Sequence, residues 1–304
     1  MKRRYIYSNI FLLFSMMVLS CNQENPPISI HHNIGLLIDT LNGDFAVAYL
    51  NLDTGEKLLI NENETFHAAS TMKTPVMIEA FKYMNQSDQK LTDSIQIYNR
   101  FFSIVDSSEF ALTPDDDGDP DLYQLVGQKI PWGELIQRMI TRSSNLATNI
   151  LIDYLGAQNV TKSMRELGAK DIQVLRGVED IKAYEAGLSN TTTAHDLMMI
   201  YENLANYRIV DSTSSQAMID ILLGQEFNSL IPAHLPEDVR VAHKTGWITG
   251  VHHDSGIVYL PDGQRYILIL LSKNVVDMEK ADESMSAISR LIYDHVYEPV
   301  VTKR

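Results

Sequence analysis

Cysteine is almost absent from this chain of 304 residues, in which Cys21 is the only one. A single cysteine excludes an intramolecular disulfide, so the fold must depend on a buried core rather than on covalent cross-links. With 45% hydrophobic and 21% charged residues, the chain is long enough to build one or two lobes around such a core.

Positive charge is also scarce, because 25 lysines and arginines face 39 acidic residues and the formal net charge is −14. An acidic surface argues against a nucleic-acid partner. The sequence also lacks the spacing of common metal sites. The helical i, i+4 arrangement of histidine ligands is found neither in His252–Asp254 nor in the pair His31 and His32. The EF-hand pattern is absent from the acidic run Asp115–Asp121. We therefore predict no metal, no organic cofactor, and a solvated loop at the acidic run.

Only one apolar stretch stands out, and it lies at the N-terminus. Basic residues within 1–4 precede Ile6–Leu19, which ends just before Cys21. This pattern is typical of a targeting segment, and the stretch is shorter than a usual membrane span. Removing residues 1–20 would take away three positive charges and no acid, which changes the formal net charge from −14 to −17.

The place of Cys21 resembles the lipidation site of bacterial lipoproteins. An ordinary secretory signal, or a cysteine that lies near the cleavage point by chance, is the alternative; we favour lipidation. We expect a signal peptide at 1–20, a lipid-anchored tether at 21–33, and a monomer in the bacterial periplasm that meets the membrane only through its lipid anchor.

A serine and a lysine three residues apart, Ser70 and Lys73, begin a stretch of helical periodicity. Pro75 is tolerated there because its missing N–H falls in the first turn. Ser70 then lies at a helix start with Lys73 one turn on, so the amine can take the proton of the hydroxyl. For these two residues alone, a capping serine and a solvated lysine would be the better interpretation.

Ser143, Ser144 and Asn145 stand between two predicted helices, 132–140 and 146–156. A capping role is again the structural alternative for either serine. In a functional interpretation, Ser143 passes a proton to a leaving nitrogen, and Asn145 holds the substrate and the lysine of the first motif.

A third motif, Lys244, Thr245, Gly246 and Trp247, lies in the first of three predicted antiparallel strands over 239–272. The lysine could merely protect a sheet edge. In a cleft it would bind a carboxylate together with Thr245, and Gly246 would allow close approach of a ligand. The N–H groups of Trp247 and Ser70 would then form an oxyanion hole.

Together these three motifs resemble those of the serine β-lactamases and penicillin-binding proteins, and their spacing is most similar to class A β-lactamases. The resemblance implies an α/β two-lobed fold. A five-stranded antiparallel sheet flanked by helices would comprise 34–69 and 233–304, with the C-terminal helix at Met285–Val296. An all-helical insert would occupy 70–232, with the site between the lobes.

The resemblance also implies a loop glutamate that activates the water releasing the acyl group. Glu179 is better spaced from Leu175, and Glu185 is its rival; we prefer Glu179, although either acid could simply be solvated. Three further departures from the family pattern matter: Ser144 replaces the usual aspartate, Trp247 stands where a small residue is common, and Ser255 stands where many class A enzymes carry an arginine. His252, His253 or Lys244 would then have to bind the substrate carboxylate, and Trp247 would narrow the cleft.

These expectations combine into a serine hydrolase of the class A β-lactamase type, which opens a β-lactam amide through an acyl-serine intermediate on Ser70. Its partner would be a small-molecule β-lactam or a peptidoglycan peptide. One alternative is a D,D-peptidase or esterase acting on cell-wall peptides. Another is a catalytically silent lipoprotein that binds muropeptides, although the intact Ser70, Lys73 and Lys244 argue against it.

Overall fold

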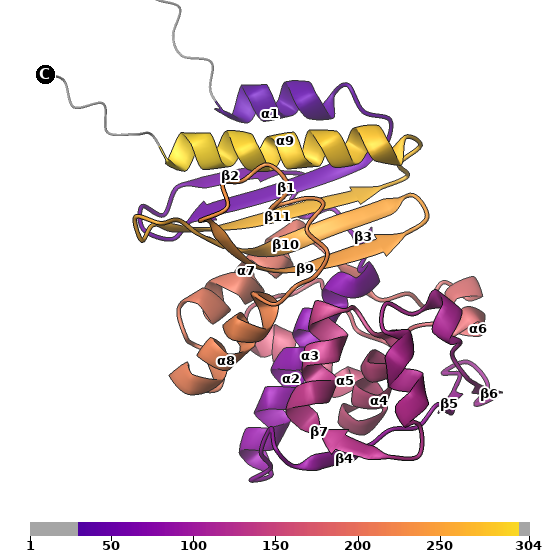
Figure 1. Cartoon of the computed structure of the whole chain (residues 1–304). Coiled ribbons are helices and arrows are strands. Elements are labelled where there is room, and N and C mark those ends of the chain that lie inside the picture. Colours follow the sequence, from indigo (N-terminus) through magenta and orange to yellow (C-terminus); the bar gives the residue numbers. More distant parts are fainter. Residues whose placement is uncertain (1–29, 298–304) are drawn as a thin grey trace, which may run out of the picture.

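A five-stranded antiparallel sheet is built from both ends of the chain (Figure 1). The structure is a computed structural model and describes residues 30–297. The strand order is β2-β1-β11-β10-β9, and the strands are β1 (Asp44–Asn51), β2 (Lys57–Ile60), β9 (Arg240–Ile248), β10 (Val251–Tyr259) and β11 (Arg265–Lys273). The predicted hairpin between β1 and β2 and the predicted three-stranded meander are both confirmed.

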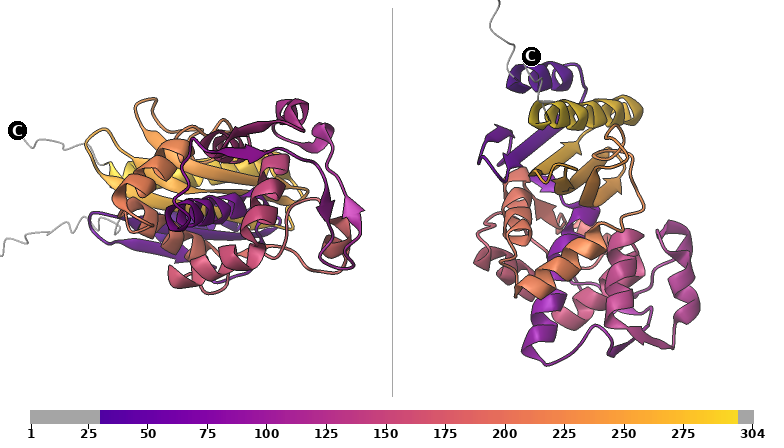
Figure 2. Two further views of the ribbon diagram at one scale, coloured as in Figure 1. Left: turned by 90° about the horizontal axis from the view of Figure 1, so that it is seen from below. Right: turned by 60° about the vertical axis from the view of Figure 1, so that its left-hand side comes forward.

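Both faces of this sheet are buried, which explains why its strands read as nearly continuous apolar runs. Alternate residues of β1 point to opposite faces: Phe45 and Val47 pack toward α1 (Ile30–Ile38) and α9 (Met278–Val296), while Ala46 and Ala48 belong to the larger core. That second face is covered by α7 (Ala194–Ala205), which contacts β1, β10 and β11. Figure 2 shows α1 and α9 stacked on the side of the sheet away from the other helices.

One terminal helix is longer than predicted, and a second terminal helix was not predicted. Helix α9 begins at Met278 rather than Met285, because the Asp277 carboxylate accepts a hydrogen bond from Lys280 N at 3.1 Å and caps the helix there. Helix α1 begins at Ile30, inside the segment predicted as a tether. The predicted signal peptide, Cys21 and tether residues 21–29 lie outside the described residues.

The second lobe is mainly helical around α2 (Lys73–Gln86), whose first nine residues are all buried. Its helices are η1 (Ala69–Met72), η2 (Pro114–Asp116), η3 (Pro120–Leu125), α3 (Trp132–Thr141), α4 (Asn145–Leu155), α5 (Ala157–Glu166), α6 (Ile181–Glu185) and α8 (Ser212–Leu222). The lobe also carries two short ladders that the prediction of an all-helical insert did not include: β4 (Ser94–Gln96) with β7 (Lys129–Pro131), and β5 (Phe101–Phe102) with β6 (Glu109–Phe110). A third ladder pairs β8 (Thr191–Thr192) of this lobe with β3 (Phe66–His67), which lies in the segment predicted for the sheet lobe.

The acidic run differs in part from the predicted solvated loop. Asp119 is only 1% exposed and accepts hydrogen bonds from Arg138 Nη1 at 2.8 Å and Arg142 Nη1 at 3.2 Å. Asp117 accepts the Leu146 N–H at 2.8 Å. Carboxylates paired in this way fasten the loop to α3 and α4, which a count of acidic residues cannot predict.

Within residues 30–297, no helix combines the length and apolar character needed to cross a bilayer. The same residues contain no group of three or more His, Cys, Asp or Glu side chains arranged to hold a metal ion.

Candidate active site

The three sequence motifs meet where the two lobes join. Lys73 Nζ donates to Ser143 O at 2.6 Å, to Ser143 Oγ at 3.0 Å and to Asn145 Oδ1 at 3.0 Å. Lys244 Nζ donates to the same Ser143 Oγ at 3.2 Å. Segments separated by 70 and 101 residues therefore share one hydroxyl, as the motif pattern requires.

Lys73 is fully buried at the first residue of α2. Burial disfavours its charged form and lowers its pKa to about 7, although the nearby carboxylates of Asp117 and Glu179 act in the opposite direction. An amine whose pKa is near 7 is neutral in about half of the molecules at pH 7, so this side chain is able both to accept and to return a proton.

Lys244, on β9, is fully buried as well. Its desolvation, together with the positive charge of Lys73, holds its pKa well below the ordinary lysine value. Because Ser143 Oγ accepts hydrogen bonds from both lysines, its own proton is left to be donated elsewhere. Ser143 reaches this place through a left-handed backbone conformation with φ of 58°.

The neighbouring Ser144 has a structural role. Its Oγ accepts a hydrogen bond from Ala147 N at 3.2 Å, and the side chain is fully buried at the N-cap of α4. The capping interpretation thus holds for Ser144 and not for Ser143, which explains how a serine can replace an aspartate at this position.

The backbone around Ser70 is tightly confined. Ala69 has φ of 44°, an uncommon conformation for a residue with a side chain. On the facing strand, a Cβ added to Gly246 would lie 3.0 Å from Ser70 N and 3.1 Å from Thr71 N. A side chain at position 246 would crowd the amide of Ser70, so Gly246 allows η1 to approach β9 closely, whereas the prediction for this glycine concerned the approach of a ligand.

A cleft of about 550 Å³ opens beside Ser70. Besides Ser70, Asn145, Glu179 and Trp247, its walls include His67, Asp116, Arg176, Asp180, Tyr184 and Asn190. Trp247 is 63% exposed at its edge. Lys73 and Lys244 lie beneath this surface, since neither is exposed.

Of the two candidate glutamates, only Glu179 belongs to the cleft. Asn145 Nδ2 lies 3.5 Å from Glu179 Oε1, while Asn145 Oδ1 accepts a hydrogen bond from Lys73 Nζ, so the amide links the lysine to this carboxylate. Desolvation and the charge of Asp116 raise the pKa of Glu179, against the opposing effect of Arg176 and Lys73. Glu185 is exposed on α6 and does not line the cleft.

The expected substitutes for a carboxylate-binding arginine lie elsewhere, Lys244 excepted. His252 Nδ1 pairs with Asp282 of α9 at 2.6 Å, and His253 is buried with its Nε2 on His67 O at 2.8 Å. Ser255 is buried too and donates to Lys244 O at 3.2 Å. The side chains of His252, His253 and Ser255 are thus used in contacts with the protein itself and do not line the cleft. A hairpin pattern in the sequence does not show which contacts the side chains of a strand will make.

Several residues of the site were not predicted from the sequence. Asp180 is buried and accepts hydrogen bonds from Ser103 Oγ at 2.8 Å and Ile104 N at 2.9 Å, so it ties the β5–β6 hairpin to the loop that carries Glu179. Asn190 Oδ1 accepts the N–H of Leu175 at 2.8 Å. A lone Asp or Asn in a loop carries no sequence signal for such long-range contacts.

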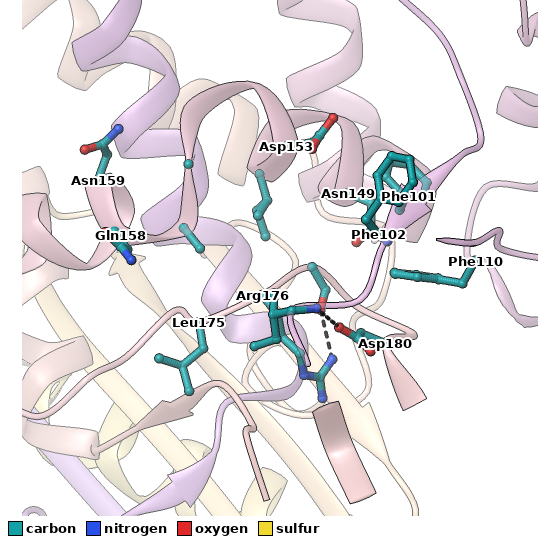
Figure 3. A pocket seen from close by; sticks show the side chains of 15 residues that line it. Phe101, Phe102, Phe110, Asn149, Asp153, Gln158, Asn159, Leu175, Arg176 and Asp180 are labelled. Carbon is teal, nitrogen blue, oxygen red and sulfur yellow. Dashed lines mark hydrogen bonds between the residues drawn. The ribbon is translucent and has the colours of Figure 1, made fainter. Parts of the chain in front are cut away.

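A second cavity of about 430 Å³ is lined in part by the loop residues Leu175–Gly177 and Asp180 (Figure 3). Rings of Phe101, Phe102 and Phe110 line one side, and Asp153 stands on α4. Arg176 and Asp180 line both cavities, so the two lie next to each other along this loop.

Comparisons with known proteins identify the family of this chain. A family model described as "Beta-lactamase enzyme family" matches residues 32–296. A β-lactamase of Bacteroides uniformis is 24% identical over 268 residues, covering 80% of this chain and 83% of that protein.

Two solved structures illustrate the likeness. PBP-A is 27% identical with a TM-score of 0.74, and the match covers 88% of this chain and 95% of PBP-A. A class A β-lactamase of Bacteroides cellulosilyticus is 21% identical with a TM-score of 0.73 over 88% of this chain and 96% of its own. The predicted two-lobed fold is confirmed, and the chain belongs to the β-lactamase enzyme family.

Proposed function

We propose that this protein is a serine hydrolase that opens β-lactams through an acyl-enzyme. Ser70 Oγ attacks the lactam carbonyl carbon while Lys73, or Glu179 through a water, takes its proton. The carbonyl oxygen becomes an oxyanion that the N–H groups of Ser70 and Trp247 stabilise. The C–N bond then breaks, and Ser143 delivers a proton to the leaving nitrogen.

Release of the acyl group needs a water, and Glu179 is the proposed base for it. Water adds to the ester carbonyl, its proton passes to the carboxylate, and Ser70 leaves as a restored alcohol. Lys244 and Thr245 would bind the substrate carboxylate from β9. The reaction requires no metal and no organic cofactor.

One observation carries this proposal: the Ser143 hydroxyl lies between two buried lysines, at 3.0 Å from Lys73 Nζ and 3.2 Å from Lys244 Nζ. That arrangement suits proton transfer toward a leaving nitrogen next to a carboxylate. One solved structure of a PBP-A mutant, 28% identical to this chain, is an acyl-enzyme complex with penicillin G. That adduct supports the same first step here.

Nitrocefin hydrolysis by the purified protein tests the proposal. We expect turnover in the wild type and a loss of at least about a thousand-fold in Ser70→Ala, because the covalent intermediate cannot form. A folded wild-type protein that leaves nitrocefin intact would contradict lactamase activity.

A second candidate keeps the acyl-serine and changes the substrate to cell-wall peptides. The absence of a guanidinium at the Ser255 position, where the serine is buried, favours it. Intact-protein mass spectrometry separates the two: a D,D-peptidase would hold its penicillin adduct for minutes or longer, and a β-lactamase would shed it. Failure of a fluorescent penicillin to label Ser70 at all would favour the silent muropeptide-binding protein.

For location, we propose a periplasmic monomer anchored through lipid on Cys21. The basic and apolar segment before that cysteine supports the proposal. Cells supplied with labelled palmitate should label the wild type and not Cys21→Ala, and the variant should leave the membrane fraction. Equal labelling of the two proteins would exclude this anchor.

A further inference from the structure

We propose that His67 is a positioning residue for acylation, which holds the Ala69–Ser70 backbone through its ring nitrogen and releases it when protonated. The proposal rests on the proposed role of Ser70 as nucleophile. His67 ends strand β3, two residues before η1 begins, and lines the cleft together with Ser70.

The first link is a hydrogen bond from the strained residue to the ring. Ala69 N donates to His67 Nδ1 at 3.1 Å. A ring nitrogen accepts such a bond only with a free lone pair, so His67 must be neutral with its proton on Nε2. The bond satisfies the amide of a residue whose φ is 44°, a conformation that costs energy for a residue with a side chain.

The second link fixes the backbone of His67 from the sheet. His253 Nε2 donates to His67 O at 2.8 Å, and His253 Nδ1 accepts the Ser272 N–H at 3.1 Å. These partners define a neutral His253 with its proton on Nε2, and burial lowers the pKa of this residue to about 4. A chain of hydrogen bonds thus runs from β11 through β10 to β3 and ends at Ala69.

This series of hydrogen bonds ends at Ala69, next to the Ser70 N–H of the proposed oxyanion hole. Ser70 N follows Ala69 directly and lies 3.0 Å from where a Cβ of Gly246 would be. A side chain at position 246 would therefore crowd the backbone of η1. Because Ser70 N follows Ala69 directly, a small rotation of the Ala69 backbone would turn the Ser70 N–H away from the carbonyl oxygen that it is proposed to stabilise.

Protonation of His67 breaks the first link. Placing a proton on Nδ1 turns the acceptor into a donor that faces the Ala69 N–H. Partial burial and the positive charge of Arg176, on the loop opposite, lower the pKa of His67, which keeps the ring neutral at pH 7. The other groups around it are the Tyr184 ring of α6 at 6.2 Å, the neutral His253 of β10, and the cleft acids Glu179 and Asp180.

The test compares acylation rates of the wild type, His67→Asn and His67→Gln with a fluorescent penicillin between pH 5 and 8. Asparagine can put an acceptor oxygen near the place of Nδ1, whereas glutamine reaches toward the place of Nε2. We expect His67→Asn to stay within about threefold of the wild type at pH 7.5, and His67→Gln to lose about tenfold or more.

The pH profiles carry the sharper readout. In the wild type, titration of Lys73 and then of His67 should make the slope of log rate against pH exceed 1 on the acid side. His67→Asn should have a smaller slope than the wild type, because one of the titrating groups has been removed. Identical slopes in the two proteins, or full activity in His67→Gln at every pH, would overturn the proposal.

Amide NMR of the wild type keeps this test independent of catalysis. The Ala69 N–H signal should shift with the titration of His67, whether or not any penicillin reacts. If the chemical shift of the Ala69 N–H does not change during this titration, the proposal is wrong even when the enzyme is active. If penicillin never acylates the wild type but the Ala69 N–H signal still shifts with the titration of His67, the proposed function is refuted. The proposed hydrogen bond between His67 and the Ala69 amide would still stand.

Discussion

At the residue scale, burial affects the protonation of the two lysines of the candidate site. Lys73 and Lys244 are both fully buried, and desolvation lowers the pKa of each. Surface lysines would remain ammonium ions at neutral pH and could not act as bases. Lys73 Nζ donates three hydrogen bonds, which requires the three N–H groups of an ammonium ion. The neutral amine has only two N–H groups, so it must lose one of these hydrogen bonds before it can act as a base.

This burial predicts a rise of the acylation rate through about pH 7. Below its pKa of about 7, Lys73 is protonated and cannot accept the Ser70 proton; above it, the neutral amine can. Stopped-flow acylation of the wild type at pH 5.5 to 8.5 measures this. Lys73→Arg should acylate at least about a hundred-fold more slowly at pH 7.5 without that rise, because a guanidinium stays charged. An unchanged profile in the variant would exclude Lys73 as the base.

The two glutamates give a matched pair of variants. In Glu179→Gln we expect deacylation to slow by about a hundred-fold or more, so that the adduct accumulates, because an amide cannot accept a proton from water. Glu185→Gln should behave as the wild type, since Glu185 is exposed outside the cleft. Mass spectrometry of quenched reactions counts the adduct, and accumulation in Glu185→Gln alone would reverse the assignment.

At the element scale, the contact between η1 and β9 depends on one missing side chain. In Gly246→Ala, the new Cβ would meet the backbone nitrogens of Ser70 and Thr71 at 3.0 and 3.1 Å, and a backbone cannot move aside cheaply. We expect acylation to fall at least about tenfold and the free energy of unfolding to fall by about 1–3 kcal/mol.

A control for this prediction lies on α1. A methyl group added at Gly35 would have no neighbouring atom within 4 Å, so Gly35→Ala should leave acylation unchanged and slightly stabilise the helix. Acylation rates and urea unfolding curves of both variants give the comparison. Equal effects of the two substitutions would show that the η1–β9 contact has no special role.

At the scale of the whole molecule, acid stability should depend on a buried histidine. His253 has a pKa of about 4 in the folded protein, against 6.5 for an ordinary histidine, because burial disfavours its charged form. Its folded pKa is lowered, so between these values the unfolded chain binds a proton that the folded chain does not. Folding therefore loses up to about 3 kcal/mol from this residue as the pH falls from about 6.5 to 4.

Urea unfolding at pH 7 and pH 4.5 measures this loss. In His253→Gln, which does not titrate, the difference between the two pH values should be smaller by about 2–3 kcal/mol. The exposed His234 supplies the matched control, and His234→Gln should keep the wild-type difference. A wild-type-like difference in His253→Gln would assign the acid sensitivity to other groups.

Local patterns were sufficient for much of this fold and for part of its site. Ser70 and Lys73 open a helix, the β1–β2 hairpin turns at Asp53–Gly55, and the meander ends the sheet, because each depends on neighbours in the chain. Where the first-turn signal was weak, as in the charged start of α9, the predicted boundary was seven residues late.

The sequence by itself determined which groups this protein can use: a serine, two lysines and an amide in an order that folds into one family. Only the tertiary structure decided that Glu179 and not Glu185 faces the cleft, that His252 and His253 turn away from it, and that both lysines are buried. The physical reason is that desolvation and contacts across a hundred residues depend on packing in three dimensions, and no spacing along the chain encodes the dielectric around a side chain.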